Sequence, residues 1–161
     1  MEFKHSRHIG LDDIECFVCA PAANNPRGLD LSFVQTEHGA KTVFTLPTCF
    51  QSYPGFLHGG IVSCVIDETM AYAGVFRYQK LPLTRKMTLS YRRGVEAGKE
   101  FICESQITAE SETGFSAKAS VSLPGRGIFV LGEADFILPT AEQAFRLMPG
   151  EAGEQWRKYF R

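Results

Sequence analysis

The sequence predicts an α+β fold in which a curved antiparallel β-sheet wraps around a central helix. The stretch from Gly55 to Ala73 begins as a turn and continues as about five turns of mostly apolar helix. A helix that is apolar on most sides belongs in the centre of a domain. Four long runs of alternating residues follow it, joined by short turns, and this pattern is typical of antiparallel strands. Strands longer than the usual ~5–6 residues are expected of a sheet that curls around something, here the apolar helix.

Length and composition are those of one ordinary globular domain. The chain has 161 residues, 44% of them hydrophobic. A formal net charge of −1 argues against binding to nucleic acid. No apolar run approaches the ~20 residues that cross a bilayer, and the residues after Met1 do not open a signal peptide. Five cysteines, an odd number, fit a reducing compartment. We therefore expect a cytoplasmic protein without membrane or nucleic-acid partners.

Three regions follow one another along the chain. Residues 1–28 form an irregular arm, residues 29–139 the sheet-and-helix domain, and residues 140–161 a helical tail. Within the domain, two short strands precede the central helix, at 29–35 and 41–46, and four strands follow it as a meander, at 84–92, 100–109, 115–123 and 128–138. Thr140 and Gln143 have the spacing of a capping box, so a last helix is expected to begin near residue 141.

The arm contains a single C-x-x-C pair, Cys16 and Cys19. A structural zinc site needs four ligands, and one such pair supplies two. His5 and His8 are the nearest residues that could complete the set, so zinc stays an alternative. We expect no metal and no cofactor, with the two cysteines packing as small buried residues between the arm and the sheet.

The central helix carries an acid that needs an explanation, because a buried carboxylate is costly unless it is paired or used. At ~100° per residue, Asp67 shares one stripe with the small residues Gly60, Ser63, Ala71 and Gly74. At the start of the helix, Gly59 and Gly60 expose N–H groups that favour negative charge on a bound oxygen. Oxyanion donors and a carboxylate on one helix are two parts of an acyl-transfer or hydrolysis site.

These residues also carry a family resemblance. His58-Gly59-Gly60 followed by Asp67, nine residues after the histidine, resembles the signature of the PaaI-like (4-hydroxybenzoyl-CoA thioesterase-like) proteins, which are hotdog-fold acyl-CoA thioesterases. Pro54-Gly55 before the histidine and Glu68-x-Met70 after the acid match one branch of that group, and the segment from Cys16 to Leu29 resembles the arm of some members. The resemblance implies the hotdog fold, hydrolysis of acyl-CoA thioesters without a cofactor, and an obligate homodimer that is often doubled to a tetramer.

The predicted chemistry needs few groups, because a thioester carbonyl is electrophilic and its thiolate leaves well. Asp67 is the candidate base or nucleophile, and the N–H of Gly59, with that of Gly60, is the candidate oxyanion donor. His58 either orients the loop near the thioester or is purely structural. Glu68 competes with Asp67, but the spacing from His58 selects Asp67, and Glu68 points ~100° away, towards the sheet or a solvent edge.

The chain departs from the family pattern at one position. Relatives carry an asparagine six residues before the histidine, where this chain has Ser52 with Gln51 beside it, and either could hold the water or the substrate. The resemblance also implies a serine or threonine hydroxyl on the strand after the helix, and Thr84 is either this group or simply a strand residue. Arg92 and Arg93 either bind the phosphates of CoA or form a solvated strand end. Phe50, Tyr53 and Met70 either line a pocket for the acyl group or belong to the hydrophobic core.

Two other functions stay open: a non-catalytic acyl-CoA-binding or regulatory hotdog protein, which typically lacks the acid on the helix, and a hotdog dehydratase, whose histidine-plus-acid arrangement is not found here. The helix geometry adds an expectation about assembly. Gly60 and Asp67 lie seven residues apart, which is ~10 Å along a helix, so one chain cannot bring both to one carbonyl. We expect two antiparallel copies to share each site.

Overall fold

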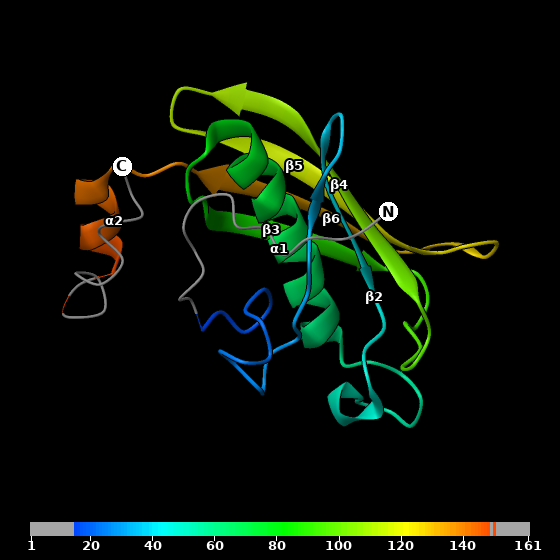
Figure 1. Cartoon of the computed structure of the whole chain (residues 1–161). Helices are drawn as coiled ribbons and strands as arrows, with labels where there is room; N and C mark the ends of the chain where they lie inside the picture. The colour runs from blue at the N-terminus through cyan, green and yellow to red at the C-terminus, as the bar shows by residue number, and fades with distance from the viewer. Residues whose placement is uncertain (1–14, 149, 151–161) are drawn as a thin grey trace.

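The computed structural model describes residues 15–148 and residue 150, and it has a six-stranded antiparallel sheet curved around one long helix (Figure 1). The predicted α+β hotdog architecture is confirmed. The elements in chain order are β1 (Val34–Gln35), β2 (Gly39–Phe44), the 3-10 turn η1 (Thr48–Phe50), α1 (Gly59–Tyr78), β3 (Leu83–Tyr91), β4 (Phe101–Ser111), β5 (Gly114–Leu123), β6 (Gly127–Ile137) and α2 (Ala141–Leu147). No helix in the described part of the chain is long and apolar enough to span a membrane.

The order of the strands differs from the predicted meander. Strands β4, β5 and β6 do form consecutive hairpins, but β3 pairs with β6 and lies at the far edge, in the order β1-β2-β4-β5-β6-β3. The chain from β3 to β4 therefore crosses the end of the sheet. This crossing is held by hydrogen bonds from the N–H of Leu57 to Val95, of Ala97 to Gly55, and of Gly98 to Leu46. It closes over the loop that leads into α1.

The first predicted strand is also shorter than expected. Only Val34 and Gln35 pair in the sheet, as β1. Leu29 and Leu31 instead donate their N–H groups to the carbonyls of Phe17 and Val18 in the arm, at 2.7 and 2.9 Å. These backbone groups bond to the arm and not to a neighbouring strand. The alternation of apolar and polar side chains does not distinguish the two cases.

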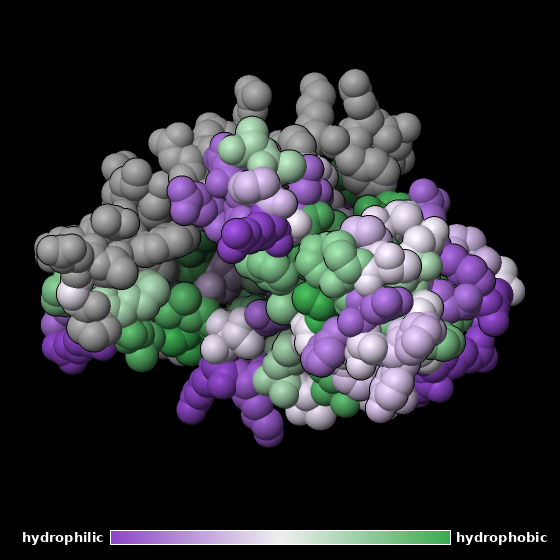
Figure 2. Space-filling view, turned by 90° about the horizontal axis from the view of Figure 1, so that it is seen from below, coloured by the Kyte–Doolittle hydropathy of each residue, from purple (hydrophilic) through white to green (hydrophobic). Residues whose placement is uncertain are grey.

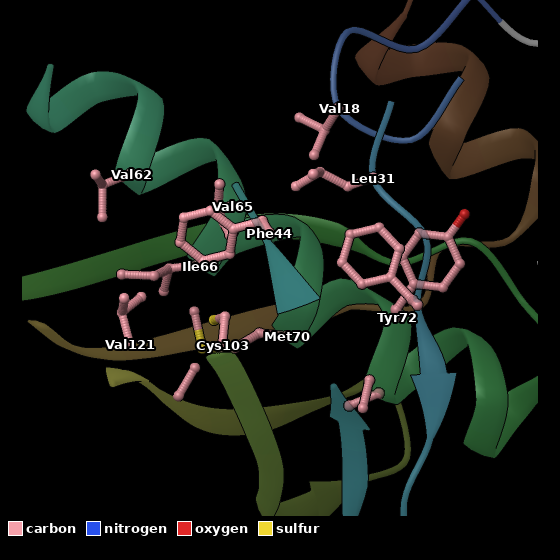
Figure 3. Packing of buried hydrophobic residues seen from close by; sticks show 14 of the residues in the cluster. Val18, Leu31, Phe44, Val62, Val65, Ile66, Met70, Tyr72, Cys103 and Val121 are labelled. Carbon is pink, nitrogen blue, oxygen red and sulfur yellow. The ribbon is translucent and has the colours of Figure 1, made fainter. Parts of the chain in front are cut away.

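Helix α1 is the centre of the core. Its inner face packs Val62, Val65, Ile66 and Met70 towards the sheet, where Val121 and Cys103 meet them (Figure 3). These side chains are almost completely buried, and burial of each large one is worth about 1.5–3 kcal/mol. Gly74 belongs to this inner packing, because a Cβ there would lie 2.3 Å from the Phe115 ring. The small-residue stripe is therefore not open at Gly74, contrary to expectation.

The arm packs onto this core, and a second helix follows the last strand. In the arm, Val18 and Leu31 lie side by side above α1 (Figure 3) and are buried. Gly28 passes so close to the arm that a Cβ would lie 2.7 Å from the carbonyl oxygen of Phe17. The predicted capping box of Thr140 and Gln143 is confirmed, and α2 begins at Ala141. The tail at 151–161, like His5 and His8, lies outside the described residues.

Candidate active site

Asp67 lies in the middle of α1 and is half-buried. Its Oδ1 atom accepts a hydrogen bond of 2.8 Å from the hydroxyl of Thr84 on β3. The sequence predicted both residues for the site, and the structure brings them together. Because β3 is the edge strand of the sheet, the pair lies along the border of the domain and not inside its core.

The surroundings of Asp67 act on its acidity in two directions. Burial removes water from the carboxylate and raises the pKa of Asp67 above its ordinary value, while the hydrogen bond from Thr84 opposes part of that shift. A carboxylate with a raised pKa is a better proton acceptor than an ordinary surface aspartate. Asp67 is thus held in one place and made more basic by the same environment.

His58 caps the start of α1. Its Nδ1 atom accepts a hydrogen bond of 2.9 Å from the N–H of Gly60, so the ring proton of a neutral His58 is on Nε2. This hydrogen bond supports the second of the two roles expected for His58, a structural role at the start of α1. The N–H of Gly60 is engaged within the chain, and the expectation that it serves as a second oxyanion donor is not supported.

The N–H of Gly59 is the group at the start of α1 that is available to a ligand. The peptide between His58 and Gly59 is fixed because its carbonyl accepts from the N–H groups of Ile61 and Val62, at 3.0 and 3.2 Å. Its N–H points out of the helix start and makes no hydrogen bond within the described part of the chain. A free, immobile N–H at a helix N-terminus is suited to stabilise an oxyanion.

The carbonyl of Gly59 is held from the other side by two hydroxyls. Tyr91 on β3 and Ser63 on α1 lie within hydrogen-bond distance of this oxygen, at 2.7 and 2.8 Å, and their hydroxyl oxygens are 2.8 Å apart. The sequence places Ser63 on the small-residue stripe but does not predict this hydrogen bond. A serine in a helix often bonds to the carbonyl four residues earlier, so the bond could have been anticipated. Tyr91 could not be found from sequence, because the contact depends on where β3 runs.

A hollow of about 500 Å³ opens beside Gly59, at the end of the molecule where α1 begins. Figure 2 views the molecule from this end, where apolar side chains are exposed between polar ones. The hollow is lined by Ser52, Tyr53, Phe56, Leu57, Gly59, Val62, Tyr91, Arg92, Arg93, Gly94 and Val95. A larger hollow, about 630 Å³, lies at the other end of α1 near Arg77 and contains none of the predicted site residues.

Gln51 and Ser52, the two candidates to replace the family's asparagine, have different surroundings. Gln51 uses its side-chain oxygen to accept the N–H of Gly55, at 3.1 Å, and so stabilises the loop before α1. Ser52 lines the hollow. Of the two arginines, Arg93 donates to the carbonyl of Arg126 and lies over the Phe129 ring, 5.4 Å from its centroid. Arg92 makes no side-chain hydrogen bond or ion pair within the described chain.

The predicted pocket residues are also separated. Tyr53 is 75% exposed and lines the hollow, whereas Phe50 is half-buried and packs against the core. Met70 has no exposed surface and belongs to the core, so the structure gives it no open face for a ligand. Glu68 lies against the arm, 3.7 Å from Cys16 Sγ, because the arm covers the side of α1 where a sheet contact or solvent edge was expected.

Comparison of this architecture with solved structures finds close matches in fold. They include a thioesterase superfamily protein (TM-score 0.65, 16% identity, 71% of this chain and 59% of that one) and the PaaI protein of E. coli (TM-score 0.61, 14% identity, 68% and 83%). Another is the smu.793 protein of Streptococcus mutans bound to acetyl CoA (TM-score 0.61, 14% identity, 66% and 86%). The chain has the hotdog fold. No family model and no curated protein matches its sequence.

Within one copy of this hotdog, the two candidate groups are too far apart to act together. Gly59 and Asp67 lie eight residues apart on the same helix, which is about 12 Å at 1.5 Å per residue. The hollow beside Gly59 accordingly does not include Asp67 or Thr84. Within a single chain, the Gly59 N–H and the Asp67 carboxylate therefore cannot both reach one ligand atom.

The hydroxyl of Tyr91 should contribute measurably to the stability of the helix start. We expect Tyr91→Phe to lower the free energy of unfolding by about 0.5–1.5 kcal/mol, because it removes one of two hydroxyls at the Gly59 carbonyl. Tyr53→Phe is the matched control, since the Tyr53 ring is 75% exposed. Urea denaturation of both variants measures the difference. Equal stabilities for the two would contradict the role assigned to Tyr91.

Proposed function

We propose that the protein is an acyl-CoA thioesterase, which hydrolyses a thioester to a free acid and CoA. The observation that carries this proposal is the Asp67 carboxylate, half-buried on the central helix and held by the Thr84 hydroxyl. Among the described residues Asp67 has this one hydrogen-bond partner and no cation, and a half-buried carboxylate without a counter-charge is a candidate functional group. The hotdog fold shared with thioesterase superfamily proteins supports the same reaction.

Asp67 has two possible parts in the reaction. As a general base, it takes a proton from water while the water oxygen attacks the thioester carbonyl carbon. As a nucleophile, it attacks that carbon itself to form a mixed anhydride, which water then hydrolyses. In both routes the carbonyl oxygen becomes negative and is stabilised by the Gly59 N–H, and the carbon–sulfur bond breaks with release of CoA thiolate.

The hollow at the start of α1 is the proposed entry site for CoA. It combines the exposed aromatic ring of Tyr53 with the guanidinium of Arg92, and arginine is well suited to bind phosphate. Arg93 contributes positive charge beside it while tethered to the Arg126 carbonyl. The smu.793 protein, which has the same fold, was solved with acetyl CoA bound. Ser52, at the position of the missing asparagine, is the group we assign to the substrate or water.

Each complete site is proposed to form between two copies of the chain. An oxyanion donor and a base must converge within a few ångströms of one carbonyl, and about 12 Å separates Gly59 from Asp67 in one helix. If two helices run antiparallel across a two-fold axis, the Gly59 N–H of each faces Asp67 of the other. The outer edge of β3 has no strand partner in the described chain, which leaves it free to face a second copy beside Asp67 and Thr84.

Replacing the Asp67 carboxylate should abolish most turnover. We expect Asp67→Asn to lower kcat by at least ~10²-fold, the usual scale for losing a general base, with the fold kept because the side chains are nearly isosteric. A panel of acyl-CoA substrates with a thiol-reactive dye measures the rate. Asp135→Asn is the matched control, since Asp135 lies on the outer face of β6 and bonds Ser116.

Three outcomes separate the alternatives. Wild-type turnover in Asp67→Asn would remove Asp67 from the mechanism. Loss of activity in Glu68→Gln with activity kept in Asp67→Asn would show that the other acid does the chemistry. A wild-type protein that binds acyl-CoA but hydrolyses none of the panel would be a binding protein, and the thioesterase assignment would fail.

The shared site can be tested by mixing two inactive variants. Asp67→Asn lacks the base, and Gly59→Pro lacks the donor N–H. Gly59 is the first residue of α1, where proline is tolerated, and His58 before it has the extended conformation that proline requires (φ −62, ψ 135). We therefore expect Gly59→Pro to fold and to be inactive. Verified heterodimers of the two should regain one working site of two.

Gly59→Ala is the control for the proline variant. It adds a Cβ that would lie 3.6 Å from the Tyr91 ring, an ordinary contact, and it keeps the N–H. Activity in Gly59→Ala and none in Gly59→Pro would assign the loss to the donor itself. Heterodimers without activity, or a fully active monomer in sedimentation, would rule out a site built by two chains.

A further inference from the structure

The arm places two thiols and a carboxylate at one point on the side of α1. Cys16 Sγ lies 3.7 Å from Glu68 Oε1, and the ligand atoms of Cys16, Cys19 and Glu68 all lie within 4.8 Å of one another. From sequence, no metal is expected, because one C-x-x-C pair supplies only two ligands. Glu68 is 52 residues away from Cys16 in the chain, so its place beside the pair is visible only in the fold.

The C-x-x-C turn is shaped to hold a thiolate. The N–H groups of Val18 and Cys19 both donate to Cys16 Sγ, at 3.3 Å, and the N–H of Ala20 closes the turn on the carbonyl of Cys16 at 3.2 Å. Hydrogen bonds to sulfur favour its ionised form, and the thiolate is the form that binds metals.

The turn is also fixed in position relative to α1. Backbone hydrogen bonds join Phe17 and Val18 to Leu29 and Leu31, and the side chains of Val18 and Leu31 are buried side by side (Figure 3). Gly28 allows the close passage of the two segments. The three ligand atoms are therefore brought together by the packing of the arm and do not depend on a ligand to assemble them.

Three acidic groups meet here without a cation from the described residues, where no ion pair involves Glu68. Burial raises the pKa of Glu68 to about 8. The hydrogen bond with Cys19 lowers the pKa of Cys16 to about 6, and the same bond raises that of Cys19. A divalent cation held by the three ligand atoms, which lie within 4.8 Å of one another, would neutralise the negative charge of this cluster.

We propose that Cys16, Cys19 and Glu68 bind one zinc ion, which joins the arm to the central helix. Zinc–sulfur and zinc–oxygen bonds of about 2.3 and 2.1 Å at a tetrahedral angle place sulfur and oxygen about 3.6 Å apart. The separation of Cys16 Sγ and Glu68 Oε1 is 3.7 Å. Two thiolates select zinc over magnesium or calcium, which prefer oxygen ligands. The fourth position is left for water or for a ligand from outside the described residues.

The 161-residue chain, stripped of metal under reducing conditions, is titrated with zinc against a chromophoric chelator and, separately, with cobalt. We expect one ion per chain and, with cobalt, the thiolate-to-metal absorption that reports sulfur ligands. Cys16→Ser/Cys19→Ser should lose both signals, and Glu68→Gln should weaken zinc binding by at least ~10-fold. Cys49→Ser, which removes an exposed thiol on η1, should leave binding unchanged.

The wild-type titration alone decides the proposal if the double-cysteine variant does not fold. Wild-type protein that takes up no zinc, or cobalt uptake without thiolate absorption, would overturn it. Equal zinc binding by folded Cys16→Ser/Cys19→Ser would do the same. All of these measurements are independent of thioesterase activity, so they stand or fall separately from the proposed function.

Discussion

The burial of α1 against the concave face of the sheet is the constraint on which the rest of the structure depends. Sheet, arm and loop cover most sides of the helix, and its inner residues are almost completely buried. Little polar chemistry can occur along such a helix. The exceptions lie where the cover ends: at the first residue, where Gly59 has a free N–H, and at the edge strand β3, where Thr84 meets Asp67.

The same rigidity separates the groups that a thioester reaction needs. A straight helix keeps Gly59 and Asp67 about 12 Å apart, and neither can move without disturbing the core. Fixed donors have an advantage, because they need no reorganisation as the oxyanion develops. A second chain is the simplest way to reunite the two halves. Glu68 lies about 100° around the helix from Asp67 and contacts Cys16 of the arm, whereas Asp67 contacts Thr84 on β3, so the two adjacent acids lie in different surroundings.

The parts of this fold that local patterns encode could be predicted from sequence. They include α1, the four long strands and the cap at Thr140, while the family resemblance supplied Asp67 and Thr84 as site residues without placing them in contact. The position of β3 beside β6 could not be predicted, because side-chain alternation does not specify which strands pair. Every contact that depends on β3 or on the arm was missed for that reason, including Tyr91 at Gly59 and Glu68 at Cys16.

In the proposed dimer, one thioester carbonyl is served by Gly59 of one chain and Asp67 of the other. A crystal structure of the Asp67→Asn variant with a non-hydrolysable acyl-CoA analogue tests it most directly. We expect the analogue's carbonyl oxygen within hydrogen-bond distance of a Gly59 N–H, with the substituted side chain at position 67 of the other subunit beside the carbonyl carbon. Both groups coming from one chain, or an acyl group bound away from Gly59, would contradict it.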